Sequence, residues 1–271
     1  MIPAPNPQSA VLAGASPAED FADLLRRQGL LVAAPSTTAA AASPLAQTQA
    51  TTILAFRFAD GILVAGDRRA TAANQIVYDR ADKVIEIDRY SLMAIAGVPA
   101  TAWEMARVLE HSFQFYRRSQ LQEMSLEGKV RALSKLLRDN LGFVLQGVGV
   151  VVPLFVTYDL EAETPRVYFY DAMGAQFEAT DFTASGSGSP AVRAVLHFEN
   201  TWGSKPLRKL KSNEAILLAL RALETAASGD SATGGVDRRA DVFPIVKIVS
   251  KSGIETLPEA RLAKLFKSRA V

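Results

Sequence analysis

The order of predicted strands and helices after residue 50 is the feature that most limits the possible fold. Apolar residues occur in short β-rich runs in some segments and recur at helical spacing in others. The sequence predicts strands over 51–58, 62–65, 84–87, 92–96, 150–158, 166–170, 182–185 and 242–249, and helices over 102–116, 126–145, 190–198, 213–227 and 258–266. Helices grouped in pairs between runs of strands favour two sheets packed face to face with helices outside. We therefore expect an α+β fold, a four-layer αββα sandwich.

Residues 1–50 differ in composition from the rest of the chain. Ala, Pro, Ser, Thr and Gln predominate, and no charged residue occurs between Arg27 and Arg57. A segment with so little bulky apolar surface does not offset the entropy lost when it is ordered. One stretch, 17–29, has acidic residues first, basic residues last, and Phe21 and Leu25 on one face. We expect a short docking helix there, within an otherwise flexible leader.

Composition excludes several kinds of chemistry. Lys+Arg (30) nearly balance Asp+Glu (28), and no long basic run favours binding to nucleic acid. The absence of cysteine removes disulfides, thiol nucleophiles and cysteine-bound zinc, and two histidines are too few for a histidine-rich metal site. The most apolar run, 148–156, is too short to span a bilayer. We expect a cytoplasmic protein with no metal, no organic cofactor and no membrane partner.

A threonine, a carboxylate and a lysine are predicted to converge where the first strand begins. If the first turn centres on residues 59–61, strand pairing sets Thr51 opposite residues near 68, with Asp67 beside the start of the first strand. Lys83 opens the next strand after an intervening loop. Cleavage between Ala50 and Thr51 would make Thr51 the N-terminal residue, with an α-amine of pKa about 7.7–8.0 that is partly neutral at cellular pH.

Such a residue would carry a nucleophile and its general base together. The amine takes the hydroxyl proton directly or through one water molecule. A Lys83 cation nearby would lower the pKa of the amine, and Asp67 would keep that lysine charged and oriented. Taken alone, each pattern also has an ordinary explanation, because Thr-Thr-Ile fits β propensity and Asp-Arg-Arg fits a solvated turn.

Several motifs, in order and at matching spacings, resemble the β subunits of proteasomes. The early motifs are Thr51-Thr-Ile, Asp60-Gly-Ile-Leu-Val-Ala-Gly-Asp-Arg-Arg-Ala-Thr71, Asp82-Lys-Val and Ala94-Ile-Ala-Gly97. The later ones are Gly186-Ser-Gly188 and Asp230-Ser-Ala-Thr-Gly-Gly235. The resemblance runs from Thr51 to about residue 250 and is closest to the bacterial, actinobacterial-type proteasomes. It implies a fold of the N-terminal-nucleophile hydrolase type, a propeptide over 1–50 and a catalytic domain over 51–271.

The resemblance also implies a role for each matched residue. The nucleophile is the Thr51 hydroxyl, and the base is its freed amine. The residues implied to tune and support it are Asp67, Lys83 and Arg69. The implied oxyanion donor is the backbone N–H of Gly97, where a side chain could obstruct the substrate carbonyl. The residues implied to surround and hold the terminal amine are Ser187, Asp230 and Thr233.

By resemblance, the substrate strand pairs with Ala70 and Thr71 and with Gly97 and its neighbours, through main-chain hydrogen bonds. The positions matching the first specificity pocket are all uncharged, which predicts cleavage after apolar residues: Ala70, Ala81, Ile95 and Pro99. Trp103 fits either the base of that pocket or the core under its helix, and the pattern favours the core.

Two residues depart from the usual pattern of the family. Ala50 stands where glycine is usual before the nucleophile, so its Cβ is expected to slow maturation. Pro99 lacks a backbone N–H and removes one donor from the substrate-pairing segment. Neither departure removes a catalytic group.

Three other functions stay open. A simpler two-ring bacterial protease, which works with an ATPase, shares the Thr-Thr-Ile start but has a shorter mature chain and is not expected to carry the 230–235 signature. A non-catalytic ring subunit commonly lacks the nucleophile or the lysine, and both are present here. A serine hydrolase would need His111 or His197, and both lie in predicted helices beside apolar residues.

The resemblance implies a threonine endopeptidase that frees its own nucleophile by autocatalytic cleavage. Seven mature subunits would form a ring, and two β rings would stack between two rings of α subunits as α7β7β7α7. An ATPase unfoldase would deliver unfolded polypeptides to the enclosed sites.

Overall fold

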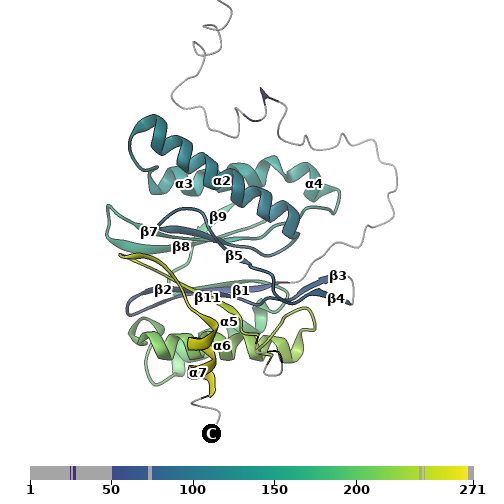
Figure 1. The fold of residues 1–271 in the computed structure, drawn as a ribbon, viewed down its shortest axis with the longest axis vertical. Coiled ribbons are helices and arrows are strands. Elements are labelled where there is room, and N and C mark those ends of the chain that lie inside the picture. The colour runs from purple at the N-terminus through teal and green to yellow at the C-terminus, as the bar shows by residue number, and fades with distance from the viewer. Residues whose placement is uncertain are drawn as a thin grey trace, which may run out of the picture.

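The protein forms a sandwich of two sheets between two helix layers. The computed structural model describes residues 25, 27–28, 51–72, 75–237, 240 and 242–267. In these residues two five-stranded sheets face each other and helices cover their outer faces (Figure 1). The predicted four-layer α+β fold is confirmed. The predicted docking helix, apart from Leu25, Arg27 and Gln28, and the bond at Ala50 lie outside the described residues.

The first sheet contains the strand that begins beside Thr51. Its strands, in spatial order, are β10 (Phe182–Gly186), β1 (Thr52–Phe58), β2 (Gly61–Gly66), β11 (Ile245–Ser250) and β12 (Gly253–Thr256). All neighbours in it are antiparallel. Its outer face is covered by α5 (Ser189–Trp202), α6 (Ser212–Gly229) and α7 (Glu259–Lys267), with a 3-10 turn at Leu207–Lys209 (Figure 1).

The second sheet is also antiparallel throughout. Its strands, in spatial order, are β5 (Val84–Glu86), β6 (Ser91–Ala94), β7 (Leu154–Asp159), β8 (Thr164–Tyr170) and β9 (Gln176–Glu178). Its outer layer contains α2 (Pro99–Gln120), α3 (Leu126–Asp139) and α4 (Leu141–Leu145) (Figure 1). Leu25, from the predicted docking segment, is half-buried and packs against the apolar cluster between this layer and the sheet.

Alternation along the strands explains the layers. In β1, Leu54 and Phe56 face the cluster under α5 and α6, whereas Ile53 and Ala55 face the second sheet. In β6 and β7, Met93 and Phe155 likewise belong to the cluster under α2 and α3. A strand that is apolar on both faces requires a covering layer on each side. The three interlayer clusters are therefore the core that holds the end of β1 in place.

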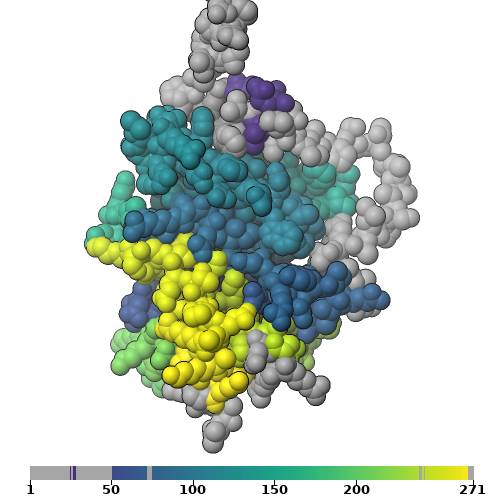
Figure 2. Space-filling model, in the orientation of Figure 1, coloured from purple at the N-terminus to yellow at the C-terminus, as the bar shows by residue number. Residues whose placement is uncertain are grey.

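Several predicted boundaries were wrong. The helix predicted over 126–145 is interrupted at Asn140, whose amide Nδ2 donates a 2.7 Å hydrogen bond to the Gly149 carbonyl. The strands predicted from 150 and from 242 begin later, at Leu154 and Ile245. The sequence reasoning missed β9, β12 and the hairpin of β3 (Ala70–Ala72) with β4 (Gln75–Tyr78), which projects from one side of the molecule (Figure 2).

Trp103 does not lie in the core. Its exposed fraction is 45 %, whereas Ala102 and Met105 on the same helix are buried. Adjacent helical residues point about 100° apart, so the face that buries Ala102 turns Trp103 outward. Pro99 and Trp103 are four residues apart on α2 and therefore share a face.

Two observations concern membranes and metals. In the part of the chain that the structure describes, no helix combines the length and apolarity needed to cross a bilayer. The same residues contain no group of three or more His, Cys, Asp or Glu side chains able to hold a metal ion.

Candidate active site

The hairpin of β1 and β2 brings Asp67 to the start of β1. Ile53 pairs with Gly66, so Thr52 and Asp67 follow as neighbours, and Asp67 N donates to Thr52 O at 3.0 Å. The register predicted from the turn at 59–61 is confirmed.

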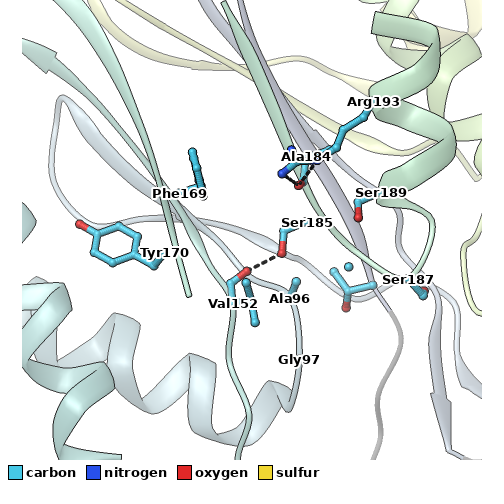
Figure 3. Close-up of a pocket in the computed structure, with 12 residues that line it drawn as sticks. Ala96, Gly97, Val152, Phe169, Tyr170, Ala184, Ser185, Ser187, Ser189 and Arg193 are labelled. Carbon is cyan, nitrogen blue, oxygen red and sulfur yellow. Dashed lines mark hydrogen bonds between the residues drawn. The ribbon is translucent and has the colours of Figure 1, made fainter. Parts of the chain in front are cut away.

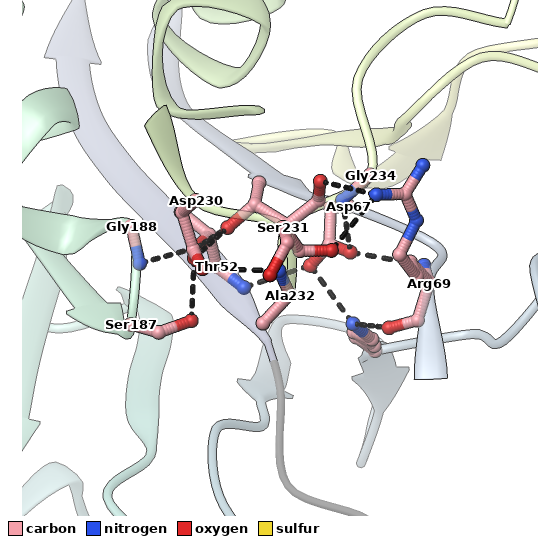
Figure 4. Close-up of polar contacts among 11 residues, drawn as sticks. Thr52, Asp67, Arg69, Ser187, Gly188, Asp230, Ser231, Ala232 and Gly234 are labelled. Atoms are coloured by element: carbon pink, nitrogen blue, oxygen red, sulfur yellow. Dashed lines mark hydrogen bonds and ion pairs between the residues drawn. The ribbon is translucent and has the colours of Figure 1, made fainter. Parts of the chain in front are cut away.

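The Asp67 carboxylate is fully buried and joins four segments (Figure 4). Its Oδ1 accepts from Thr52 N at 2.7 Å and from Lys83 Nζ at 2.8 Å. Its Oδ2 accepts from Arg69 N at 2.9 Å and from Gly234 N at 3.0 Å. A carboxylate with four donors is fixed in orientation, and it ties β1, the chain after β2, the start of β5 and the 230–235 loop together.

Lys83 is buried beside this carboxylate, with 3 % of its surface exposed. Its Nζ also donates to the Arg69 carbonyl oxygen. Burial lowers the pKa of Lys83, and the charge and hydrogen bond of Asp67 oppose that shift without cancelling it. Asp67 therefore favours the charged ammonium that burial would otherwise disfavour.

A second polar cluster joins the chain after β10 to the loop after α6 (Figure 4). Ser187 Oγ and Thr233 Oγ1 both donate to Asp230 Oδ2, at 2.6 Å and 2.5 Å. Burial acts to raise the pKa of Asp230, but these hydrogen bonds and one from Ala232 N outweigh it, and the net pKa is lowered. The sequence-predicted residues Ser187, Asp230 and Thr233 thus meet in one ionised cluster.

Thr52 connects this cluster to β1, and sequence reasoning missed it. Its Oγ1 accepts from Gly188 N at 2.9 Å and lies 2.6 Å from Thr233 Oγ1. Because Thr233 donates its proton to Asp230, Thr52 must be the donor to Thr233. A signal was available in the sequence, since Thr52 occupies a position that alternation assigns to the same apolar face as Leu54.

Replacing Thr52 with valine is expected to lower the free energy of unfolding by about 1–3 kcal/mol, because the buried Gly188 N–H loses its acceptor and Thr233 its donor. Denaturant unfolding of the Thr51→Ala chain, with and without Thr52→Val, measures the difference. Thr52→Ser keeps the hydroxyl and serves as the control. Equal destabilisation by valine and serine would mean that the hydroxyl contributes nothing.

Arg69 clamps the 230–235 loop against the chain that follows β2. Its Nη1 donates to the carbonyl oxygens of Ser231 at 2.9 Å and Thr233 at 3.1 Å. The predicted supporting residue therefore contacts both polar clusters, through the loop on one side and through Asp67 on the other.

Thr51 lies between the two clusters and is 3 % exposed. Its carbonyl oxygen accepts from Ser187 N at 3.1 Å. Gly186 has φ 94°, and a Cβ there would lie 1.7 Å from the Thr51 carbonyl oxygen. Only glycine allows β10 to approach Thr51 in this way.

A cavity of about 490 Å³ borders Thr51 and Gly97 (Figure 3). Gly97 has φ 113°, and a Cβ there would lie 2.0 Å from the Val150 carbonyl oxygen. Close packing against Val150 therefore requires glycine at this position, in addition to any need to leave room for the substrate. Gly97 pairs with Val151 through bonds from Val98 N to Val150 O and from Val152 N to Ala96 O. In such a pair the N–H of Gly97 points away from the partner, and no described residue accepts from it.

Apart from Gly97, the predicted substrate-binding positions lie after β2 or at α2. Ala70 and Thr71 lie on β3, the strand that follows β2. The side chain of Ile95 packs under α2, and Pro99 is the first residue of that helix. The N–H that Pro99 lacks would have no partner within the helix, so proline suits this position. Ala81 is buried, and its N donates to Arg68 O at 3.0 Å.

Both histidines lie on helices of the outer layers. His111 is on α2 and His197 is on α5, each exposed on an outer helix. The His197 ring contacts Trp202. Neither histidine is among the residues that line the cavity beside Thr51.

Comparisons with known proteins agree on one family. A model of the family described as "Proteasome subunit" matches residues 47–240. "Proteasome subunit beta 2" of Thermomonospora curvata is 40 % identical over 220 residues, covering 80 % of this chain and 75 % of its own length. "Proteasome subunit beta" of Acidimicrobium ferrooxidans is 36 % identical over 249 residues, covering 92 % and 88 %. "Proteasome subunit beta 1" of Streptomyces avermitilis is 39 % identical over 227 residues, covering 83 % and 78 %.

Proposed function

The chain belongs to the proteasome subunit family, and on that basis we propose that it is the catalytic β subunit of a bacterial proteasome core particle. The observation that supports catalysis most directly is one juxtaposition. Thr51 precedes β1, the buried Asp67–Lys83 pair lies beside the start of that strand, and Gly97 borders the same cavity as Thr51.

Activation is proposed to remove residues 1–50. The Thr51 hydroxyl oxygen attacks the Ala50 carbonyl carbon, the Ala50–Thr51 amide bond breaks, and an ester forms on Thr51. Water then hydrolyses that ester, releases the leader with a new carboxylate at Ala50 and leaves a free amine on Thr51. The Cβ of Ala50, where glycine is usual, is proposed to slow this step.

Peptide hydrolysis would follow the same chemistry on a substrate. The Thr51 amine takes the hydroxyl proton, and the oxygen attacks the scissile carbonyl. The Gly97 N–H stabilises the oxyanion, because it is already oriented and has no other acceptor among the described residues. The amine proton passes to the leaving amino group, and water hydrolyses the ester. Ser187, Asp230 and Thr233 are proposed to hold the amine, and Asp67, Lys83 and Arg69 to set its electrostatics.

The pH dependence of kcat/KM is expected to be bell-shaped. Activity rises as the Thr51 amine loses its proton, and it falls again as Lys83 loses its own. Because the pKa of Lys83 is lowered from 10.5, the alkaline fall begins below pH 10.5. In Lys83→Arg, normalised to its own maximum, the fall should move to higher pH, since a guanidinium stays charged. An unmoved alkaline limb would mean that another group causes it.

Specificity and assembly are proposed from the family. Ala70, Ala81, Ile95 and Pro99, with Trp103 on the same helical face as Pro99, would form an uncharged pocket for an apolar residue before the scissile bond.

The subunit would assemble with proteasome α subunits as α7β7β7α7 in the cytoplasm, and an ATPase would supply unfolded polypeptides. The 230–235 loop, bound to Asp67 through Gly234 N, supports this reading over the simpler two-ring protease.

N-terminal sequencing, intact mass and subunit composition of the purified assembled particle test this function. A catalytic subunit begins at Thr51. A structural ring subunit would keep residues 1–50, and a particle without α subunits would favour the two-ring protease. The Thr51→Ala particle is the control.

A further inference from the structure

The cavity beside Thr51 lies at the β10 edge of the first sheet, between the two sheets (Figure 3). Ala96, Val152 and Phe169 contribute apolar surface from the second sheet and its continuation, and Ser185 and Ser187 contribute polar surface from β10 and the residue after it. Ser185 Oγ is already bonded to the Val152 carbonyl at 2.7 Å. These five residues are uncharged, so that part of the cavity suits an uncharged side chain or main chain, and recognition of charge must come from another lining residue.

The position of this cavity decides which half of a substrate it can receive. β1 has β2 on one side and β10 on the other. The positions proposed to bind the residue before the scissile bond lie on the β2 side or under α2, and Ala70, Ala81, Ile95 and Pro99 do not line this cavity. A substrate that places the residues before its scissile bond at those positions, with the scissile carbonyl between Thr51 and Gly97, must continue toward β10 after that bond.

Arg193 is the charged side chain at this cavity among the described residues that line it. Its Nε and Nη2 donate to the Ala184 carbonyl at 3.2 Å and 2.8 Å, which holds the guanidinium against β10 (Figure 3). No carboxylate among the described residues pairs with it, and the other guanidinium N–H groups stay available. A guanidinium fixed in this way is suited to binding a carboxylate.

We propose that this cavity binds the substrate segment after the scissile bond and that Arg193 recognises a carboxylate on that segment. The inference rests on the proposed function, because it takes Thr51 as the nucleophile. The carboxylate has two sources with the same chemistry, an acidic side chain or the C-terminus of a short peptide. Arg193 thereby selects substrates by the segment after the scissile bond, which is released when the ester forms on Thr51.

The experiment uses internally quenched peptides on the mature assembled particle. All share the residues before the cleaved bond. One set has an amidated C-terminus and carries Glu, Gln or Lys at the first or second position after that bond. The other ends two residues after the bond, with a free carboxylate or an amide. In wild type we expect kcat/KM for the carboxylate-bearing member of a set to exceed that for its lysine or amide counterpart by about tenfold. The ratio should shrink at high salt because Arg193 is exposed.

Arg193→Ala should bring the ratios close to one, and Arg193→Glu should reverse the Glu-to-Lys ratio. The matched control is Arg221→Glu on α6, an exposed arginine outside the cavity lining, which should keep the wild-type ratios. A higher kcat/KM for the carboxylate-bearing peptide in only one of the two sets still supports the proposal. It then identifies the source of the carboxylate as the acidic side chain or as the peptide C-terminus. Unchanged ratios in Arg193→Glu overturn it. A coumarin amide, which has no peptide after the cleaved bond, separates the two failures: if wild type does not hydrolyse it, the proposed function fails.

Discussion

Thr51→Ala is expected to reduce peptide hydrolysis by about 10⁴-fold or more and to leave residues 1–50 attached in the assembled particle. The substitution removes the hydroxyl that is the proposed nucleophile both in cleavage of the leader and in peptide hydrolysis, so both reactions should stop. Intact mass reports the leader, a fluorogenic peptide reports turnover, and size-exclusion chromatography reports assembly. Rings made only of the variant prevent an active neighbour from cutting the leader.

Thr51→Ser is the matched control because it keeps a hydroxyl and an α-amine. It should release the leader and hydrolyse peptides, at a lower rate than wild type. Because Thr51 is 3 % exposed and packed beside Gly186, both variants change the local packing slightly. A Thr51→Ala particle that still loses residues 1–50 would place the nucleophile elsewhere in the chain.

Asp67→Ala is expected to lower the free energy of unfolding by about 3–5 kcal/mol and to abolish peptidase activity. The substitution leaves the Lys83 ammonium buried without its 2.8 Å carboxylate partner. It also leaves the buried N–H groups of Thr52 and Gly234 without an acceptor. Arg131→Ala, which removes an exposed ion pair with Glu127 on α3, should change the same quantity by less than about 0.5 kcal/mol.

The double variant Asp67→Asn with Lys83→Met separates folding from catalysis. Asparagine retains an oxygen acceptor in place of the carboxylate, and methionine fills the volume of the lysine without a charge. Unfolding stability should return to within about 2 kcal/mol of wild type, whereas peptide hydrolysis should stay absent because the Lys83 ammonium that lowers the pKa of the Thr51 amine is gone. Full activity in the double variant would exclude the proposed electrostatic role of the pair.

Local pattern was enough for most of the secondary structure and part of the site. Period-two and helical spacing predicted the paired helices and most strands, and the turn at 59–61 predicted the register that brings Asp67 beside β1. Those signals act over short distances, and Asp67 is 15 residues from Thr52 and 16 from Lys83. The short β3–β4 hairpin was missed because strands of three and four residues give little periodicity.

The sequence by itself determined the order of the layers, the first hairpin and the residue types available for chemistry at Thr51. Only the tertiary structure decided that Thr52 meets Thr233 across 181 residues, that Gly234 reaches Asp67 across 167, and that Arg193 borders the same cavity as Thr51. Side-chain periodicity specifies which face of a strand or helix is buried, but not which distant loop lies against its end. That contact depends on how two sheets and their helices pack, and packing is a property of the whole chain.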